Sequence, residues 1–241
     1  MTGSERIHAA RDAVHDAVDE SGERFHHAVE HLKPKLRGWL HAAILPVAIA
    51  AGIVLVALSP NATTRIGSAI FATSAVLLFG VSAVMHRTDL PRHVDDMLRR
   101  FDHSNIFLLI AGTYTPFTLL LLDGTEERIL LTLVWAGALA GIAFRVFWLS
   151  APRWIYTPVY LAMGWAAIFW MPDFAREAKV SVLALMIVGG ALYSVGGFVY
   201  GFRRPDPAPR WFGFHEVFHT LTIIAFITHY VGISIATYSL R

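Results

Sequence analysis

Long apolar stretches separated by short polar breaks constrain the fold of this chain more than any other feature. A helix needs about 20 apolar residues to cross a hydrocarbon core of about 30 Å. A continuous apolar segment in a bilayer forms a helix because its backbone groups find no water there. The breaks contain proline, glycine, asparagine and aspartate, which favour turns. We therefore predict an all-α integral membrane protein with seven transmembrane helices, near residues 39-58, 65-86, 103-122, 129-149, 154-172, 180-200 and 215-238.

The composition agrees with a membrane protein and excludes several functional classes. Hydrophobic residues make up 55% of the chain and charged residues 16%, whereas an ordinary soluble domain has about 25% charged residues. The chain has no cysteine, which excludes disulfides, thiolate metal sites and iron–sulfur clusters. The net charge is +2, but the basic residues do not gather on one element. We therefore expect no nucleic-acid partner.

The distribution of charge divides the chain and predicts its orientation. Residues 1-38 form a charged segment, and residues 39-241 form the seven-helix domain. Most lysines and arginines fall in the segments that share a side with the N-terminus, and such residues are enriched in cytoplasmic loops. We predict a cytoplasmic N-terminus, an external C-terminus and a multi-pass protein of the cell inner (plasma) membrane. Segment 1-38 is either an amphipathic helix on the inner membrane surface or a solvated helix.

Five polar residues interrupt the apolar stretches at the same predicted depth. Ser82 and His86 are four residues apart, and so are His215 and His219, so each pair occupies one helix face. The alternating direction of the spans brings Asp102 to the same cytoplasmic side. Polar residues of these types are costly inside a bilayer and mark functional sites there.

These residue types fit a hydrolytic zinc site. Three neutral imidazoles, from His86, His215 and His219, leave a fourth zinc position for water. Zinc lowers the pKa of such a water to about 7 and polarises a carbonyl group. Asp102 is then the predicted general base and acid, and Ser82 orients a ligand or donates to the developing oxyanion. The alternative is that all five residues bridge helices through ordinary hydrogen bonds.

Two other metal sites match parts of the same pattern. His215 to His219 also reads as H-E-x-x-H, in which Glu216 would be the base of a metalloprotease. The later His229 lies about 15 Å along the helix from His219 and cannot bind the same ion, so an intramembrane metalloprotease needs a ligand from another helix. A haem pair on His215 and His229 needs a partner helix with matching histidines, and no other span has them. We therefore expect no haem.

Three further polar residues of the spans are given structural roles. We expect His229 to bridge helices, and we expect His41 and His103 to border the membrane interface. Arg145 lies near an inner helix end, and we expect it to extend to the membrane surface.

Four segments of the chain carry a family resemblance: Ser82-Ala83-Val84-Met85-His86-Arg87, Leu98-Arg99-Arg100-Phe101-Asp102-His103-Ser104, Ile110-Ala111-Gly112-Thr113-Tyr114-Thr115-Pro116-Phe117 and His215-Glu216-Val217-Phe218-His219. On these segments, the sequence from about Lys33 to the C-terminus resembles the hemolysin III family, bacterial relatives of the progestin and adipoQ receptors and of alkaline ceramidases. The resemblance implies a seven-helix fold, zinc on His86, His215 and His219, and Asp102 and Ser82 beside the zinc water. It implies that Glu216 is incidental, and it suggests hydrolysis of a lipid amide such as a ceramide.

Our leading hypothesis is a zinc-dependent membrane hydrolase of a lipid amide or ester that enters laterally from the bilayer. One alternative is a membrane-perturbing, cytolytic protein of the hemolysin type in which zinc is structural. A second is a receptor-like sensor. The expected partners are a membrane lipid substrate and the lipid bilayer, and the sequence specifies no oligomeric state.

Overall fold

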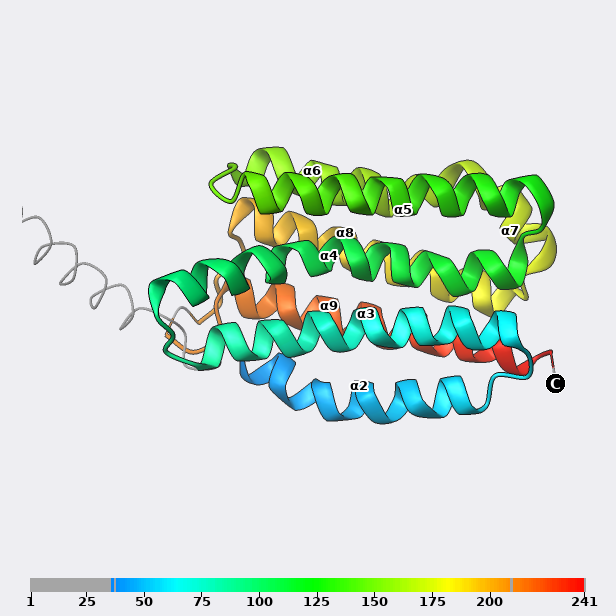
Figure 1. Ribbon diagram of the computed structural model, residues 1–241, viewed down its shortest axis with the longest axis horizontal. Coiled ribbons are helices and arrows are strands. Elements are labelled where there is room, and N and C mark those ends of the chain that lie inside the picture. Colours follow the sequence, from blue (N-terminus) through cyan, green and yellow to red (C-terminus); the bar gives the residue numbers. More distant parts are fainter. Residues whose placement is uncertain (1–35, 37, 209, 241) are drawn as a thin grey trace, which may run out of the picture.

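The structure, a computed structural model, describes residue 36 and residues 38–208 and 210–240 (Figure 1). The predicted segment 1-38 therefore lies outside the described residues except for Leu36 and Gly38. The regular secondary structure in the described part of the chain is helical, apart from one isolated bridge between Ala208 and Phe212. Its helices are α2 (Trp39–Ala57), α3 (Ala62–Arg87), α4 (Arg92–Leu121), α5 (Gly124–Phe147), α6 (Arg153–Gly164), the 3-10 helix η1 (Ala166–Trp170), α7 (Met171–Glu177), α8 (Val180–Phe202) and α9 (Phe214–Tyr238).

The helices form a bundle of elongated, roughly parallel rods that alternate in direction (Figure 1). Six of them, namely α2, α3, α4, α5, α8 and α9, are long and apolar enough to cross a membrane. The seventh crossing is a bent unit that consists of α6, η1 and α7. The predicted all-helical, seven-helix fold is confirmed, while the cytoplasmic position of the N-terminus stays a prediction.

The bend in the seventh crossing is the main difference from the predicted continuous helix at 154-172. Helix α6 ends at Gly164, and Pro172 lies in the first turn of α7, where a missing N–H costs no helical hydrogen bond. A tyrosine from α4 satisfies the backbone groups at the break: the Tyr114 hydroxyl donates to the Gly164 carbonyl at 2.8 Å and accepts from the Ala167 N–H at 2.8 Å. Backbone groups freed inside a membrane protein need such partners.

Helix α4 lies at the centre of the bundle, and it is the most buried of the candidate spans. Glycines allow its neighbours to approach closely. A Cβ at Gly112 would lie 2.2 Å from the Ser74 Oγ of α3, and a Cβ at Gly141 of α5 would lie 2.3 Å from the Phe107 ring of α4. Small residues are the usual means of close helix packing in membranes. Helix α4 also begins at Arg92, well before the predicted start near 103. The helix thus extends beyond the apolar stretch on which the prediction was based.

Candidate metal centre

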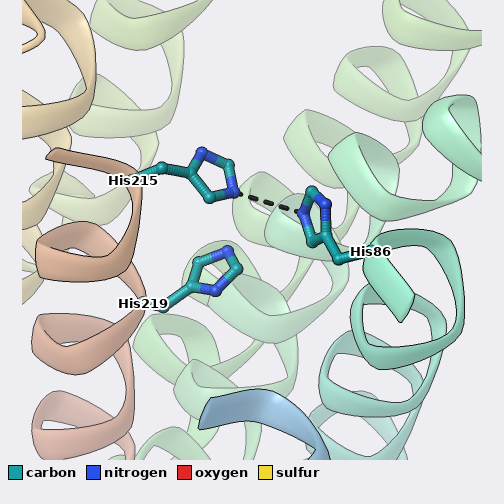
Figure 2. A group of neighbouring side chains, drawn as sticks. All are labelled: His86, His215 and His219. Carbon is teal, nitrogen blue, oxygen red and sulfur yellow. Dashed lines mark hydrogen bonds between the residues drawn. The ribbon is translucent and has the colours of Figure 1, made fainter. Parts of the chain in front are cut away.

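Three histidines from two helices meet at one end of the bundle. His86 lies in the last turn of α3, and His215 and His219 lie in the first two turns of α9. Figure 2 shows the three rings turned toward a common space between the helices. One ring nitrogen from each lies within 4.8 Å of the others, and the Nε2 atoms of His86 and His215 are 3.2 Å apart.

This spacing fits a tetrahedral metal ion. Zinc binds imidazole nitrogens at about 2.0–2.1 Å, so two nitrogens on a tetrahedral ion lie roughly 3.3 Å apart. The His86–His215 separation of 3.2 Å is close to this value. The ligand nitrogens all lie within 4.8 Å of one another, so the third must move by up to about 1.5 Å when an ion binds. Imidazole ligands suit zinc, copper, iron and nickel better than magnesium or calcium. The cluster could therefore bind a transition metal.

Local structure around the two helix ends positions the histidines. Gly38, before α2, has a φ of +78°, and a Cβ there would lie 2.7 Å from the His86 Cβ. The chain thus packs directly against the end of α3 that carries His86. At the start of α9, Glu216 is buried and its Oε2 accepts a hydrogen bond from the Gly213 N–H at 2.9 Å. Glu216 therefore caps the turn that carries His215.

Asp102 and Ser82 lie beside the histidines. The Ser82 side chain lies close to the Asp102 carboxylate, and Arg99, one turn earlier on α4, is a nearby positive charge. Ser82 is buried and lies one turn from His86 on α3. All five residues singled out in the sequence line the same cavity. The structure thus brings them together, although it does not test the roles assigned to them.

The cavity has a volume of about 260 Å³ and continues from the histidines into the bundle between α4, α6, α8 and α9. Its histidine end is polar and includes Asp102 and Arg153. The Arg153 guanidinium is held over the Tyr200 ring, 4.6 Å from its centroid. Apolar side chains form much of the remaining wall, among them Leu78, Ile106, Leu109, Ile110, Leu161 and Phe218.

His41 belongs to the site, which the sequence reasoning missed. Its ring stacks on His219, with centroids 3.8 Å apart and an angle of 16° between planes. It is buried, and neither of its ring nitrogens has a hydrogen-bond partner within the described part of the chain. A signal was available, because α2 begins at the same end of the bundle as His86 and His215 (Figure 1).

The prediction that Arg145 reaches the membrane surface is wrong. Arg145 is only 1% exposed. Its guanidinium donates to the Leu149 carbonyl at 3.3 Å and lies 4.4 Å from the centroid of the Tyr156 ring. The chain turns back after α5 and brings carbonyl oxygens and an aromatic face to the charge, so the side chain needs no path to water.

His103 lines the cavity, and its Nε2 lies 3.3 Å from the Tyr200 hydroxyl.

His229 lies away from the cluster and joins two helices. Its Nε2 donates to the Met186 carbonyl of α8 at 3.2 Å, which confirms the predicted helix-bridging role. Among the residues that the structure describes, His86, His215 and His219 form the one group that could hold a metal ion.

Fold and site together define a multi-pass, seven-helix membrane protein with a three-histidine cluster inside the bundle. The chain matches the family model described as "Haemolysin-III related" over residues 29–230. Because the match covers most of the chain, the protein belongs to this family, which is related to the adiponectin receptors.

Three relatives illustrate the range of similarity. The chain is 39% identical to "Hemolysin-3 homolog" of Bacillus subtilis (strain 168) over 135 residues, 56% of this chain and 63% of the relative. It is 34% identical to "Hemolysin-3" of Bacillus cereus over 140 residues, 58% of this chain and 64% of the relative. It is 27% identical to "Adiponectin receptor protein" of Drosophila melanogaster over 190 residues, 68% of this chain and 41% of the relative. The matched regions thus span less than two thirds of each relative.

Proposed function

We propose that this protein is a zinc-dependent hydrolase that cleaves an amide or ester bond of a membrane lipid. One observation carries the proposal: a three-histidine cluster shares the polar end of a cavity with Asp102 and Ser82, and the remaining wall of that cavity is largely apolar. We further propose that the chain resides in the plasma membrane with its N-terminus in the cytoplasm, as the distribution of lysine and arginine suggests.

The shape and lining of the cavity support a lipid substrate. Ligand sites are mostly apolar concavities in which a few polar groups fix the orientation of the ligand. Here an acyl chain would lie against Leu109, Ile110 and Leu161, and its carbonyl group would reach the histidine end. Because the cavity lies between helices that cross the bilayer, we propose that the substrate enters laterally from the lipid.

Asp102 and Ser82 would handle the proton in this reaction. Zinc bound by His86, His215 and His219 would supply a Lewis acid that polarises the carbonyl group and acidifies water. Hydrolysis adds water to the carbonyl carbon and breaks the bond to the amide nitrogen or ester oxygen. An Asp102 carboxylate oxygen accepts the proton that water loses and returns it to the leaving group. The Ser82 hydroxyl would donate to that carboxylate and hold it in place.

The first test measures bound metal. Detergent-purified wild-type protein should contain about one zinc per chain by elemental mass spectrometry, and His219→Ala should lose it. His93→Ala is the matched control, since His93 is an exposed histidine of α4 outside the cluster. Wild-type protein that stays without stoichiometric metal after incubation with zinc would refute the proposed metal site.

The second test measures turnover by the zinc-loaded protein on a panel of ceramides and glycerolipids. Removal of a general acid or base lowers rates by about 10²–10⁴, so we expect Asp102→Asn to reduce lipid hydrolysis by at least 100-fold. Asp96→Asn is the control, because Asp96 is an exposed carboxylate on the same helix and does not line the cavity. Unchanged turnover in Asp102→Asn would exclude the proposed base.

The names of the two Bacillus relatives favour a second candidate, a membrane-perturbing activity with structural zinc. Dye release from liposomes distinguishes membrane perturbation from lipid hydrolysis. Release that persists in Asp102→Asn and is lost in His219→Ala would support membrane perturbation, because only the metal ligand would then matter. A lipid hydrolase without lytic activity should leave the liposomes intact while it consumes its substrate.

A further inference from the structure

The cavity has a second polar region, far from the metal centre. His229 of α9 and Tyr193 of α8 both line the cavity, and their ring centroids are 5.6 Å apart. His229 lies ten residues after His219 on the same helix, which places this region about 15 Å from the histidine cluster along the helix axis. The wall between the two regions is largely apolar.

Two buried polar atoms in this distal region have no partner. The His229 Nε2 donates to the Met186 carbonyl at 3.2 Å, so the proton is on Nε2 and Nδ1 is an acceptor. Within the described residues, neither this Nδ1 nor the Tyr193 hydroxyl has a hydrogen-bond partner, and both atoms are buried. His229 as a whole is only 7% exposed. Buried polar atoms of native proteins normally have partners, so this pair indicates a ligand.

The bundle is built to hold the His229 ring at this place. A Cβ at Gly189 of α8 would lie 2.3 Å from the His229 Nε2, so only glycine leaves room for the ring. The Phe117 ring packs edge to face with the His229 ring, with centroids 5.8 Å apart. Because the ring is held by its contacts and by the Met186 carbonyl, His229 has a fixed position beside the cavity.

We propose that His229 and Tyr193 form a distal subsite that binds a hydroxyl group carried within the acyl chain of the lipid. A hydroxyl group donates to the His229 Nδ1 and accepts from the Tyr193 hydroxyl, which matches the pair of unpartnered atoms. The inference rests on the proposed function insofar as it places the acyl chain in the cavity. It adds that the preferred lipid carries its hydroxyl group well along the chain, not beside the scissile bond.

The test is a binding measurement that does not depend on turnover. Zinc-loaded wild-type protein in detergent is titrated with stearic acid, with stearic acid hydroxylated near the middle of its chain, and with stearic acid hydroxylated beside the carboxyl group. A net hydrogen bond corresponds to about a three- to tenfold change in affinity. We expect the mid-chain hydroxyl group to strengthen binding by this factor and the hydroxyl group beside the carboxyl group to add nothing.

A matched pair of tyrosine variants locates the effect. Tyr193→Phe removes the unpartnered hydroxyl and should abolish the preference for the mid-chain hydroxyl group. Tyr114→Phe removes another hydroxyl from the cavity wall, one already bonded to the Gly164 carbonyl and the Ala167 N–H. It should lower thermal stability and retain the preference. Thermal unfolding of each variant verifies that it is folded before it is titrated.

The outcomes distinguish failure of the distal subsite from failure of the proposed hydrolysis. Equal binding of the plain and mid-chain hydroxylated acids by wild-type protein would overturn the subsite, and ordered water would then be its occupant. Retention of the preference in Tyr193→Phe would overturn it as well, and binding of no acid would overturn both the subsite and the lipid cavity. A preference that persists in Asp102→Asn while turnover is lost supports both proposals, and a preference in a protein without turnover supports the subsite alone.

Discussion

Replacing Gly38 by alanine should weaken metal binding although Gly38 is not a ligand. The added Cβ would lie 2.7 Å from the His86 Cβ and 2.9 Å from the Arg87 Cγ. Ordinary contact begins at 3.4 Å, so the Gly38 segment and the end of α3 must move apart by about 0.7 Å. The contacted His86 atom is next to the backbone, so a change of rotamer cannot relieve the clash.

The size of the effect follows from the tolerance of a metal site. Ligand distances must hold to about ±0.2 Å, and mutations that disturb ligand orientation from the outer shell cost about 10–100-fold in metal affinity. We expect a loss of this size for Gly38→Ala, which corresponds to about 1.4–2.7 kcal/mol. The left-handed backbone at Gly38, with φ of +78°, adds roughly 1–2 kcal/mol of destabilisation for a residue with a side chain.

Gly124→Ala is the control for the destabilisation that comes from the left-handed backbone alone. Gly124 also has a positive φ, +56°, but a Cβ there would meet nothing within 4 Å. It begins α5, at the opposite end of the bundle from the histidines (Figure 1). Zinc affinity is measured by competition with a chromophoric chelator, and stability by thermal unfolding in the metal-free state. If both variants bind zinc as the wild type does, the packing of Gly38 against His86 does not position the ligand.

Further substitutions test three separate parts of the structure. Glu216→Gln keeps an acceptor for the Gly213 N–H, so lipid turnover should stay within about twofold of wild type, whereas a 100-fold loss would favour the metalloprotease. Arg145→Leu removes the charge-assisted bonds to carbonyl groups and should lower the free energy of unfolding by about 2 kcal/mol in detergent; an unchanged melting temperature would contradict this. Gly141→Ala should destabilise the bundle because its Cβ would meet the Phe107 ring at 2.3 Å, and Phe107→Leu should restore part of the loss in the double variant. A double variant no more stable than Gly141→Ala would argue against that contact.

The bent crossing shows where sequence patterns stop predicting the fold. The apolar stretch at 154-172 has the length of a span, and nothing in its local pattern requires a 3-10 turn at Ala166–Trp170. The turn is possible because Tyr114, about fifty residues earlier in the chain, satisfies the backbone at Gly164 and Ala167. A partner at this sequence distance leaves no mark on local periodicity.

The three-histidine cluster was accessible to sequence reasoning because two rules bring its members together. Four-residue spacing places His215 and His219 on one helix face, and the alternating direction of the spans brings His86 to the same end. The position of His41 at the same end of the bundle was accessible in this way, but its stacking on His219 depends on the rotation of α2 against α9. The role of Tyr193 was not accessible, because it depends on the rotation of α8 against α9.

The sequence by itself determined the number of crossings, the helical class and the histidines that gather at one end of the bundle. It did so because the thickness of a bilayer and the period of a helix are properties of local chain geometry. Tertiary structure alone decided the bend in the seventh crossing, the burial of Arg145, the stacking of His41 on His219 and the cavity that joins two polar regions. These features depend on how helices rotate and approach one another, and side-chain contacts between distant segments set that packing.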